Sequence, residues 1–225
     1  GLSGHMKGLI FLTLVFIITS SNFNLRNLEN MSSSSQAIKW FSSHAETSAA
    51  KFLHNTESGS FIHTITDYLA DSSLNVLDVG AGSGDVASVL AKNGHTVTAV
   101  EPCISLRQIG EKRYASLPLY WIEDQLPSLA SLSSREGLFD LVLAYAVLMF
   151  MDESERIESY KRLTRMGRKD GLIALLNKHT QMAPERGAYP IPLNEIDSVA
   201  VNLGWKPIFS AVLPPTHGDN DDLWM

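Results

Sequence analysis

The hydrophobic positions along the chain follow two alternating patterns. Short continuous apolar runs, typical of strands buried in a parallel sheet, alternate with segments whose apolar residues recur every three or four positions, as in amphipathic helices. The predicted strands and their exits are residues 74–79, 96–100, 117–122, 139–150, 172–177 and 205–213. The predicted helices between them are residues 85–92, 104–114, 153–166 and 194–203. This alternation predicts an α/β fold, a doubly wound and mostly parallel sheet with helices on both faces.

A mostly helical pattern precedes this core between Gln36 and Ala70. Its apolar side chains recur so that they lie on roughly one face of a helix. These residues are Ile38, Trp40, Phe41, Ala45, Ala49, Phe52 and Leu53. The segment can pack plainly against the sheet or cover a ligand site, and the pattern alone leaves both alternatives open.

The first thirty residues need a separate interpretation. Residues 1–5 look like an expression scar and are set aside. The apolar run at residues 8–18 is too short for a membrane span, which takes roughly 20 residues. Three interpretations of the extension at residues 6–30 stay open. It is sequence upstream of a misplaced start codon, with Met31 as the true start, or a packed or dimer-forming apolar element, or an export signal.

Composition narrows the classes of function. The chain has a formal net charge of −6 and no basic block, so we expect no nucleic-acid partner. Its single cysteine, Cys103, excludes an intrachain disulfide. None of the seven histidines forms an H-x-x-x-H or H-E-x-x-H pair, so we expect no metal site.

The most informative stretch joins the first core strand to the helix that follows it. Asp78 is followed by glycines at positions 80, 82 and 84, which gives the pattern D-x-G-x-G-x-G. Glycines permit a tight turn and let a ligand approach the backbone closely. A dinucleotide fingerprint needs G-x-G-x-x-G, and Asp85 stands where its third glycine would be, which disfavours a nicotinamide dehydrogenase. The pattern resembles motif I of the class I S-adenosylmethionine-dependent methyltransferases, whose fold is Rossmann-like.

Other segments between residues 36 and 213 carry the same resemblance. Glu101-Pro102 ends the second core strand, and a carboxylate there can accept both hydroxyls of a ribose. Glu123-Asp124 precedes Leu126-Pro127 in a loop similar to the one that holds adenine, and Asp124 is the first choice for the adenine amino group. Phe139-Asp140 opens a strand typical of the family. The resemblance implies these cofactor-binding residues: Asp78, Gly80, Ala81, Gly82, Gly84, Glu101, Pro102, Glu123, Asp124, Ala144 and Tyr145.

The resemblance also implies where the methyl acceptor binds. Helices of residues 31–73 would form a lid over the cofactor, and the polar loop at residues 178–190 would face the acceptor. Phe150 occupies the place where many small-molecule relatives have a histidine base, so His179 becomes the candidate base. Tyr145 is the second candidate catalytic residue. The predicted substrate-binding residues are Trp40, Phe52, Lys178, His179, Arg186 and Tyr189.

The function that this resemblance implies is methyl transfer from S-adenosylmethionine to a small-molecule acceptor, a metabolite or a natural-product intermediate. S-adenosylhomocysteine would be the product, and no metal is needed. Two alternatives stay open, a peptide or protein side chain as acceptor and a catalytically inactive, cofactor-binding regulatory protein. We expect a cytoplasmic protein without a stable membrane span, with export as the alternative, and a homodimer through the apolar N-terminal segment as a further alternative.

The end of the sheet is the least certain part of the predicted fold. A complete fold of this class has a seventh strand, antiparallel to the others, after the sixth. Here only residues 219–225 follow the turn, so that strand is expected to be short, missing or supplied from elsewhere. We consider the hypothesis that residues 8–18 fill the gap, within the molecule or by exchange. The expected organisation is one domain at residues 31–225, with a lid at 31–73 and a core at 74–225.

Overall fold

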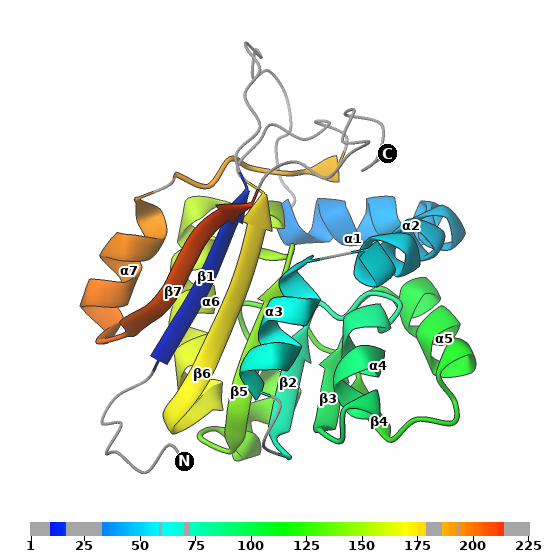
Figure 1. Cartoon of the computed structure of the whole chain (residues 1–225). Helices are drawn as coiled ribbons and strands as arrows, with labels where there is room; N and C mark the ends of the chain where they lie inside the picture. The colour runs from blue at the N-terminus through cyan, green and yellow to red at the C-terminus, as the bar shows by residue number, and fades with distance from the viewer. Residues whose placement is uncertain are drawn as a thin grey trace, which may run out of the picture.

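A seven-stranded sheet forms the centre of the molecule (Figure 1). The computed structural model describes residues 10–16, 33–58, 60–69, 73–178, 186–192 and 194–213. Within these residues the strand order is β4-β3-β2-β5-β6-β1-β7, and all six pairings between neighbouring strands are parallel. The predicted doubly wound α/β fold is confirmed.

The elements follow the predicted alternation closely. The strands are β1 (Ile10–Phe16), β2 (Asn75–Val79), β3 (Thr96–Val100), β4 (Leu119–Ile122), β5 (Phe139–Tyr145), β6 (Gly167–Lys178) and β7 (Lys206–Leu213). The α-helices are α1 (Ser33–Ser43), α2 (Ala45–Ser58), α3 (Ser60–Leu69), α4 (Asp85–Lys92), α5 (Ile104–Arg113), α6 (Glu153–Met166) and α7 (Glu195–Leu203). Two 3-10 helices, η1 (Ala130–Arg135) and η2 (Leu148–Phe150), complete the set. The mostly helical segment before the core therefore comprises three helices.

The N-terminal strand β1 takes the place that the sequence left open in the sheet. It pairs with β6 from Leu172 to Lys178 on one side and with β7 from Lys206 to Leu213 on the other. The hypothesis that the apolar run at residues 8–18 fills the gap within the molecule is confirmed, since this run is rich in strand-forming residues and supplies the strand. The expectation that the seventh strand is short or missing is wrong. The orientation also differs from the family pattern, since β1 runs parallel to both neighbours.

Helices cover both faces of the sheet, and β5 shows how the side chains divide between them. Leu141 and Leu143 point to the face covered by α3 and α4, whereas Val142 and Ala144 point to the face covered by α6 and α7. All four side chains are buried. This two-sided burial explains why the core strands are continuous apolar runs rather than alternating ones.

The helices α1 and α2 lie across the carboxyl ends of the strands (Figure 1). The Ser34 hydroxyl near the start of α1 donates to Glu155 Oε1 at 3.2 Å, which connects this cover to α6. Helix α6 itself begins with a capping box, in which Asp152 accepts the Glu155 N–H at 2.9 Å. Within the described residues, no helix combines the length and the apolar character needed to cross a membrane.

Candidate active site

The turn between β2 and α4 brings bare backbone to the carboxyl edge of the sheet. Gly80, Gly82 and Gly84 have φ values of +73°, +56° and +77°, a region that favours glycine. A Cβ at Gly80 would lie only 2.2 Å from Val147 Cγ2, so no side chain fits there. The N–H groups of Gly80 and Ala81 donate to the Val100 carbonyl at 2.8 and 2.9 Å, which holds the turn against β3.

The carboxylate of Glu101 organises this turn from the end of β3. Its Oε2 accepts the Gly82 N–H at 2.8 Å, and its Oε1 accepts the Cys103 N–H at 2.8 Å. Each carboxylate oxygen has a second lone pair, so both can also accept hydroxyls of a ligand. Burial raises the pKa of Glu101 to about 7, although the two backbone hydrogen bonds oppose that shift.

Asp78 lies beside Glu101 at the base of the same pocket. Its side chain is 1% exposed, and its Oδ2 has no hydrogen-bond partner among the described residues. Burial and the negative charge of Glu101 raise the pKa of Asp78 to about 7. A buried acceptor without a partner fits a ligand that brings a donor or a positive charge.

Asp85 has a structural partner set that explains its presence in the glycine turn. Its Oδ1 accepts from Arg113 Nη1 at 2.8 Å and from the Tyr114 hydroxyl at 2.5 Å, and its Oδ2 accepts from the Ser83 hydroxyl. The carboxylate therefore fastens the start of α4 to the end of α5, where a dinucleotide fingerprint would have a glycine.

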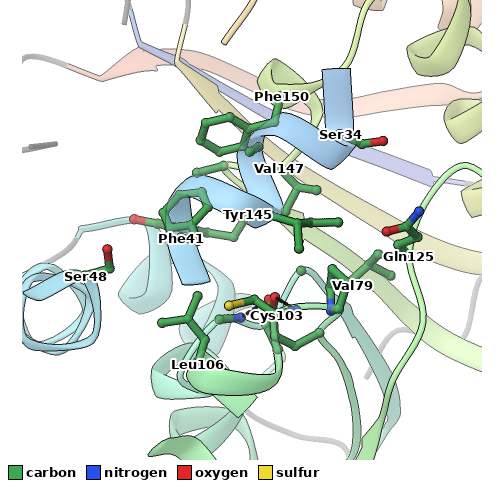
Figure 2. Close-up of a pocket in the computed structure, with 18 of the residues that line it drawn as sticks. Ser34, Phe41, Ser48, Val79, Cys103, Leu106, Gln125, Tyr145, Val147 and Phe150 are labelled. Atoms are coloured by element: carbon green, nitrogen blue, oxygen red, sulfur yellow. Dashed lines mark hydrogen bonds between the residues drawn. The ribbon is translucent and has the colours of Figure 1, made fainter. Parts of the chain in front are cut away.

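The two candidate adenine acids have different surroundings. Glu123 pairs with Arg107 Nη2 at 2.6 Å, its side chain is 66% exposed, and it does not line the pocket. Asp124 does line the pocket, but its oxygens accept the backbone N–H groups of Gln125 at 2.8 Å and Ser131 at 2.7 Å. Asp124 thus shapes the loop, and the Gln125 side chain faces the pocket from that loop (Figure 2).

The chain turns sharply at the carboxyl end of β5. Ala146 has a φ of +55°, which is uncommon for a residue with a side chain, and its N–H donates to the Leu176 carbonyl at 2.7 Å. This turn sends the chain into η2, so that Tyr145, Val147 and Phe150 line the pocket. Strained backbone of this kind concentrates at functional sites.

A row of aromatic rings covers the pocket from above. The Phe41 ring lies 6.1 Å from the Phe52 ring, 5.1 Å from the Trp40 ring and 5.3 Å from the Phe150 ring, between centroids. Figure 2 shows Phe41 and Phe150 on one side of the pocket and Gln125 on the other. The lid helix α1 and η2 therefore share one apolar wall.

The comparison with family models agrees with this geometry. Residues 77–175, from β2 to β6, match the model described as a methyltransferase domain. This match identifies residues 77–175 as a methyltransferase domain. In the comparison with curated proteins, nothing matches significantly.

Solved structures share the fold of this methyltransferase domain. A 1,6-didemethyltoxoflavin-N1-methyltransferase from Burkholderia thailandensis matches at TM-score 0.61 and 16% identity, covering 76% of each chain. The magnesium protoporphyrin IX methyltransferase of Synechocystis matches at 0.58 and 16%, covering 79% of this chain and 88% of that one. A TehB-like enzyme from Corynebacterium glutamicum matches at 0.55 and 22%, covering 72% and 83%. These identities support the shared fold.

The methyltransferase pocket brings most of the predicted site residues together. From the cofactor set, it is lined by Asp78, Gly80, Ala81, Gly82, Glu101, Pro102, Asp124 and Tyr145. From the substrate set, it is lined by Trp40, Phe52 and Arg186. Four predicted residues do not line it: Gly84, which packs against Trp121, the exposed Glu123, the fully buried Ala144 and the half-buried Tyr189. The Lys178 side chain and all of His179 lie outside the described residues.

Several residues that line this pocket were not among the predicted site residues. They are Phe41, Lys51, Gln125, Met149, Phe150 and Met151, among others. Phe41 lay within the amphipathic pattern, but that pattern does not say whether a side chain meets the sheet or a pocket. Gln125 stood between the two acids and the Leu-Pro pair, and no local signal distinguished it. Among the described residues, no cluster of three His, Cys, Asp or Glu side chains could hold a metal.

Proposed function

We propose that this protein methylates a small-molecule acceptor with S-adenosylmethionine, in the cytoplasm where that cofactor is available. The observation that carries the proposal is a single pocket with two chemically different ends. One end has the glycine turn and the buried acids Asp78 and Glu101, and the other has an apolar wall of aromatic and methionine side chains. Such a concave, mostly apolar pocket with a few placed polar groups suits a small ligand.

The residues at the first end fit the cofactor. Glu101 can accept the two ribose hydroxyls while it keeps its backbone hydrogen bonds. The free oxygen of Asp78 suits the positively charged amino group of the cofactor, which would also lower the charge repulsion with Glu101. The Gln125 amide carries a donor and an acceptor, which match the hydrogen-bonding edge of adenine.

The residues at the second end would position the acceptor. S-adenosylmethionine supplies a methyl group that its sulfonium already activates. The protein then contributes mainly orientation and exclusion of water, which Trp40, Phe41 and Phe150 favour by enclosing the acceptor. Tyr145 can donate a hydrogen bond at the junction of the two ends, and His179 stays a candidate base for an acceptor that must lose a proton.

The first experiment separates the cofactor from its alternatives. Isothermal calorimetry with S-adenosylhomocysteine and with NAD should show binding of the first and none of the second. Radiolabelled S-adenosylmethionine should then transfer its methyl group to members of a panel of small acceptors. Binding of NAD in preference to S-adenosylhomocysteine would contradict the proposal. Binding without turnover across small-molecule and peptide panels would favour an inactive regulatory protein instead.

A further inference from the structure

The charged residues of the pocket are divided between its two ends. Four acidic residues line it: Asp78, Asp85, Glu101 and Asp124. Asp78 lies in β2, and the other three follow β2, β3 and β4, respectively. Of the described lining residues, the basic ones are Lys51 on α2 and Arg186, which follows β6. The two cations therefore require separate explanations.

The row of aromatic rings shows at which end each cation lies. Phe52 is close to the glycine turn, since a Cβ at Gly82 would lie 3.2 Å from its ring, and Lys51 precedes it on α2. From Phe52 the row continues through Phe41 to Trp40. The Arg186 guanidinium carbon lies 4.5 Å from the centroid of the Trp40 ring, at the other end of the row.

This arrangement suits the two cations to different ligands. The cofactor carries one carboxylate, and Lys51 lies at the cofactor end. Arg186 lies at the acceptor end, and its side chain is only 3% exposed. A buried guanidinium presents five N–H donors in a plane, so it can keep contacts within the chain and still bind a carboxylate through two parallel hydrogen bonds.

We propose that the methyl acceptor is a planar aromatic molecule that carries a carboxylate. Its ring lies against Phe41 and Phe150, and its carboxylate binds Arg186, which lies over the Trp40 ring. This inference rests on the proposed function, because it assigns the second end of the pocket to the acceptor. Offset or edge-to-face ring contacts and the charged hydrogen bonds would together fix the orientation of the acceptor.

The test measures binding of matched probes to the whole protein saturated with S-adenosylhomocysteine. Calorimetry compares 4-hydroxybenzoate with 4-hydroxybenzamide and indole-3-acetate with indole-3-acetamide, which tests the charge. It also compares benzoate with cyclohexanecarboxylate, which tests the planar ring. The carboxylates should bind at least about tenfold more tightly than their amides, and benzoate more tightly than its saturated counterpart.

Variants of Arg186 test whether this residue causes the preference for carboxylates over amides. Arg186→Gln should remove the preference for carboxylates, a loss of about ten- to hundredfold in their affinity. Arg186→Lys should retain part of it, because it keeps the charge but loses the planar fork. Arg168→Gln is the matched control, since Arg168 is exposed and pairs with Asp140 away from the pocket, and it should retain the full preference. Thermal melting verifies that each variant is folded.

Each of the other possible results overturns either the acceptor proposal alone or both proposals. If S-adenosylhomocysteine binds but amides bind as well as carboxylates, or no carboxylate binds, the acceptor proposal is overturned and the proposed function stands. The same holds if Arg186→Gln weakens S-adenosylhomocysteine and leaves the carboxylates unchanged, because Arg186 would then serve the cofactor. If the wild-type protein does not bind S-adenosylhomocysteine, both proposals are overturned.

Discussion

The two halves of the sheet are built in different ways. The strands β4, β3, β2 and β5 come from one continuous stretch, residues 75–145, and local helices or turns connect them. In the other half, β1 begins at residue 10 but lies between β6 and β7, which begin at residues 167 and 206. The first half is thus assembled from nearby segments, and the second half joins opposite ends of the chain.

This difference parallels the division of the pocket. The glycine turn, the two buried acids and the Gln125 loop all belong to the first half. The acceptor end combines α1, which precedes the core, and η2, which follows β5, with Arg186, which follows β6. A half built from local units can carry a recognisable motif, whereas the second half depends on contacts between distant segments.

The largest expected effect comes from removing β1. A protein that starts at Met31 lacks β1. Strand β7 would then lose its pairing with β1, and β6 would lose one of its two neighbours. The free energy of unfolding should fall by several kcal/mol, at about 1 kcal/mol for each lost hydrogen bond. Hydrogen exchange should accelerate in residues 172–178 and 206–213 while residues 75–100 stay protected.

Urea unfolding and exchange measured by mass spectrometry check this prediction. The control is a protein that starts at Met6 and lacks only residues 1–5, which should behave like the full chain. Equal stability of the Met31 form would contradict the intramolecular role of β1 and favour the interpretation that the true start is Met31.

The sequence predicted the first half well because its signals are local. The run Leu74–Val79, the glycines after it and Glu101 at the end of the next strand are neighbours in sequence and in space. For β1 the sequence showed only apolar character, and its partners lie more than 150 residues away. The gap in the sheet suggested its place, but nothing local indicated the parallel orientation.

The site shows the same limit at the level of single residues. Asp78 and Glu101 stand in a pattern that specifies chemistry, so their approach could be predicted. The contact between Arg186 and Trp40 joins residues that are 146 positions apart, and no pattern in the sequence indicates that pairing. Tertiary contacts of this kind define the acceptor wall, which explains why the sequence predicts the cofactor better than the acceptor.

The next largest effect should come from Gly80→Ala in the first half. The new Cβ would lie 2.2 Å from Val147 Cγ2, and the alanine would have to adopt a φ of +73°. Backbone strain and overpacking should together lower the free energy of unfolding by roughly 2–4 kcal/mol. Affinity for S-adenosylhomocysteine should fall by about a hundredfold or more, because the turn must shift. Calorimetry and thermal melting measure both quantities.

A substitution at a second glycine distinguishes the effect of backbone strain from the effect of the close contact with Val147. Gly94 has a φ of +88°, but a Cβ there has no neighbour within 4 Å among the described atoms. Gly94→Ala should therefore cost about 1 kcal/mol of stability and leave cofactor affinity unchanged. The double variant Gly80→Ala, Val147→Ala should recover part of the lost affinity. Equal effects of Gly80→Ala and Gly94→Ala would contradict the tight fit at the turn.

A smaller effect concerns the pH dependence of the buried acid pair. The pKa values of Asp78 and Glu101 are both raised to about 7, whereas the same groups ionise near pH 4 in the unfolded chain. Between pH 4 and 7 the folded protein therefore binds more protons than the unfolded chain. The free energy of unfolding of the ligand-free protein should fall as pH rises through this window.

Cofactor binding should have the opposite dependence on pH. A cationic ligand and ribose hydroxyls favour the ionised carboxylates, so binding near pH 6 should release protons, and affinity should weaken as pH falls below 7. Calorimetry in two buffers of different ionisation enthalpy measures the released protons. Glu101→Gln should reduce that release and flatten the pH dependence of stability. A proton release that is absent in the wild-type protein would contradict a protonated pair.

The smallest expected effect on stability comes from replacing a buried polar residue in the second half of the sheet, which we compare with a buried polar residue in the first half. Asp78 in β2 and Asn177 in β6 both have side-chain atoms without partners among the described residues, but only Asp78 lines the pocket. Asn177 is fully buried in register with Val15 of β1. Replacing an unsatisfied amide with an apolar side chain of similar size removes a desolvation penalty, so Asn177→Leu should raise the free energy of unfolding by about 1 kcal/mol.

Asn177→Leu should leave affinity for S-adenosylhomocysteine unchanged, whereas Asp78→Asn should lower that affinity. If Asn177→Leu instead weakens cofactor binding as Asp78→Asn does, the division of the pocket between the two halves is wrong, because a residue of the second half would then serve the first.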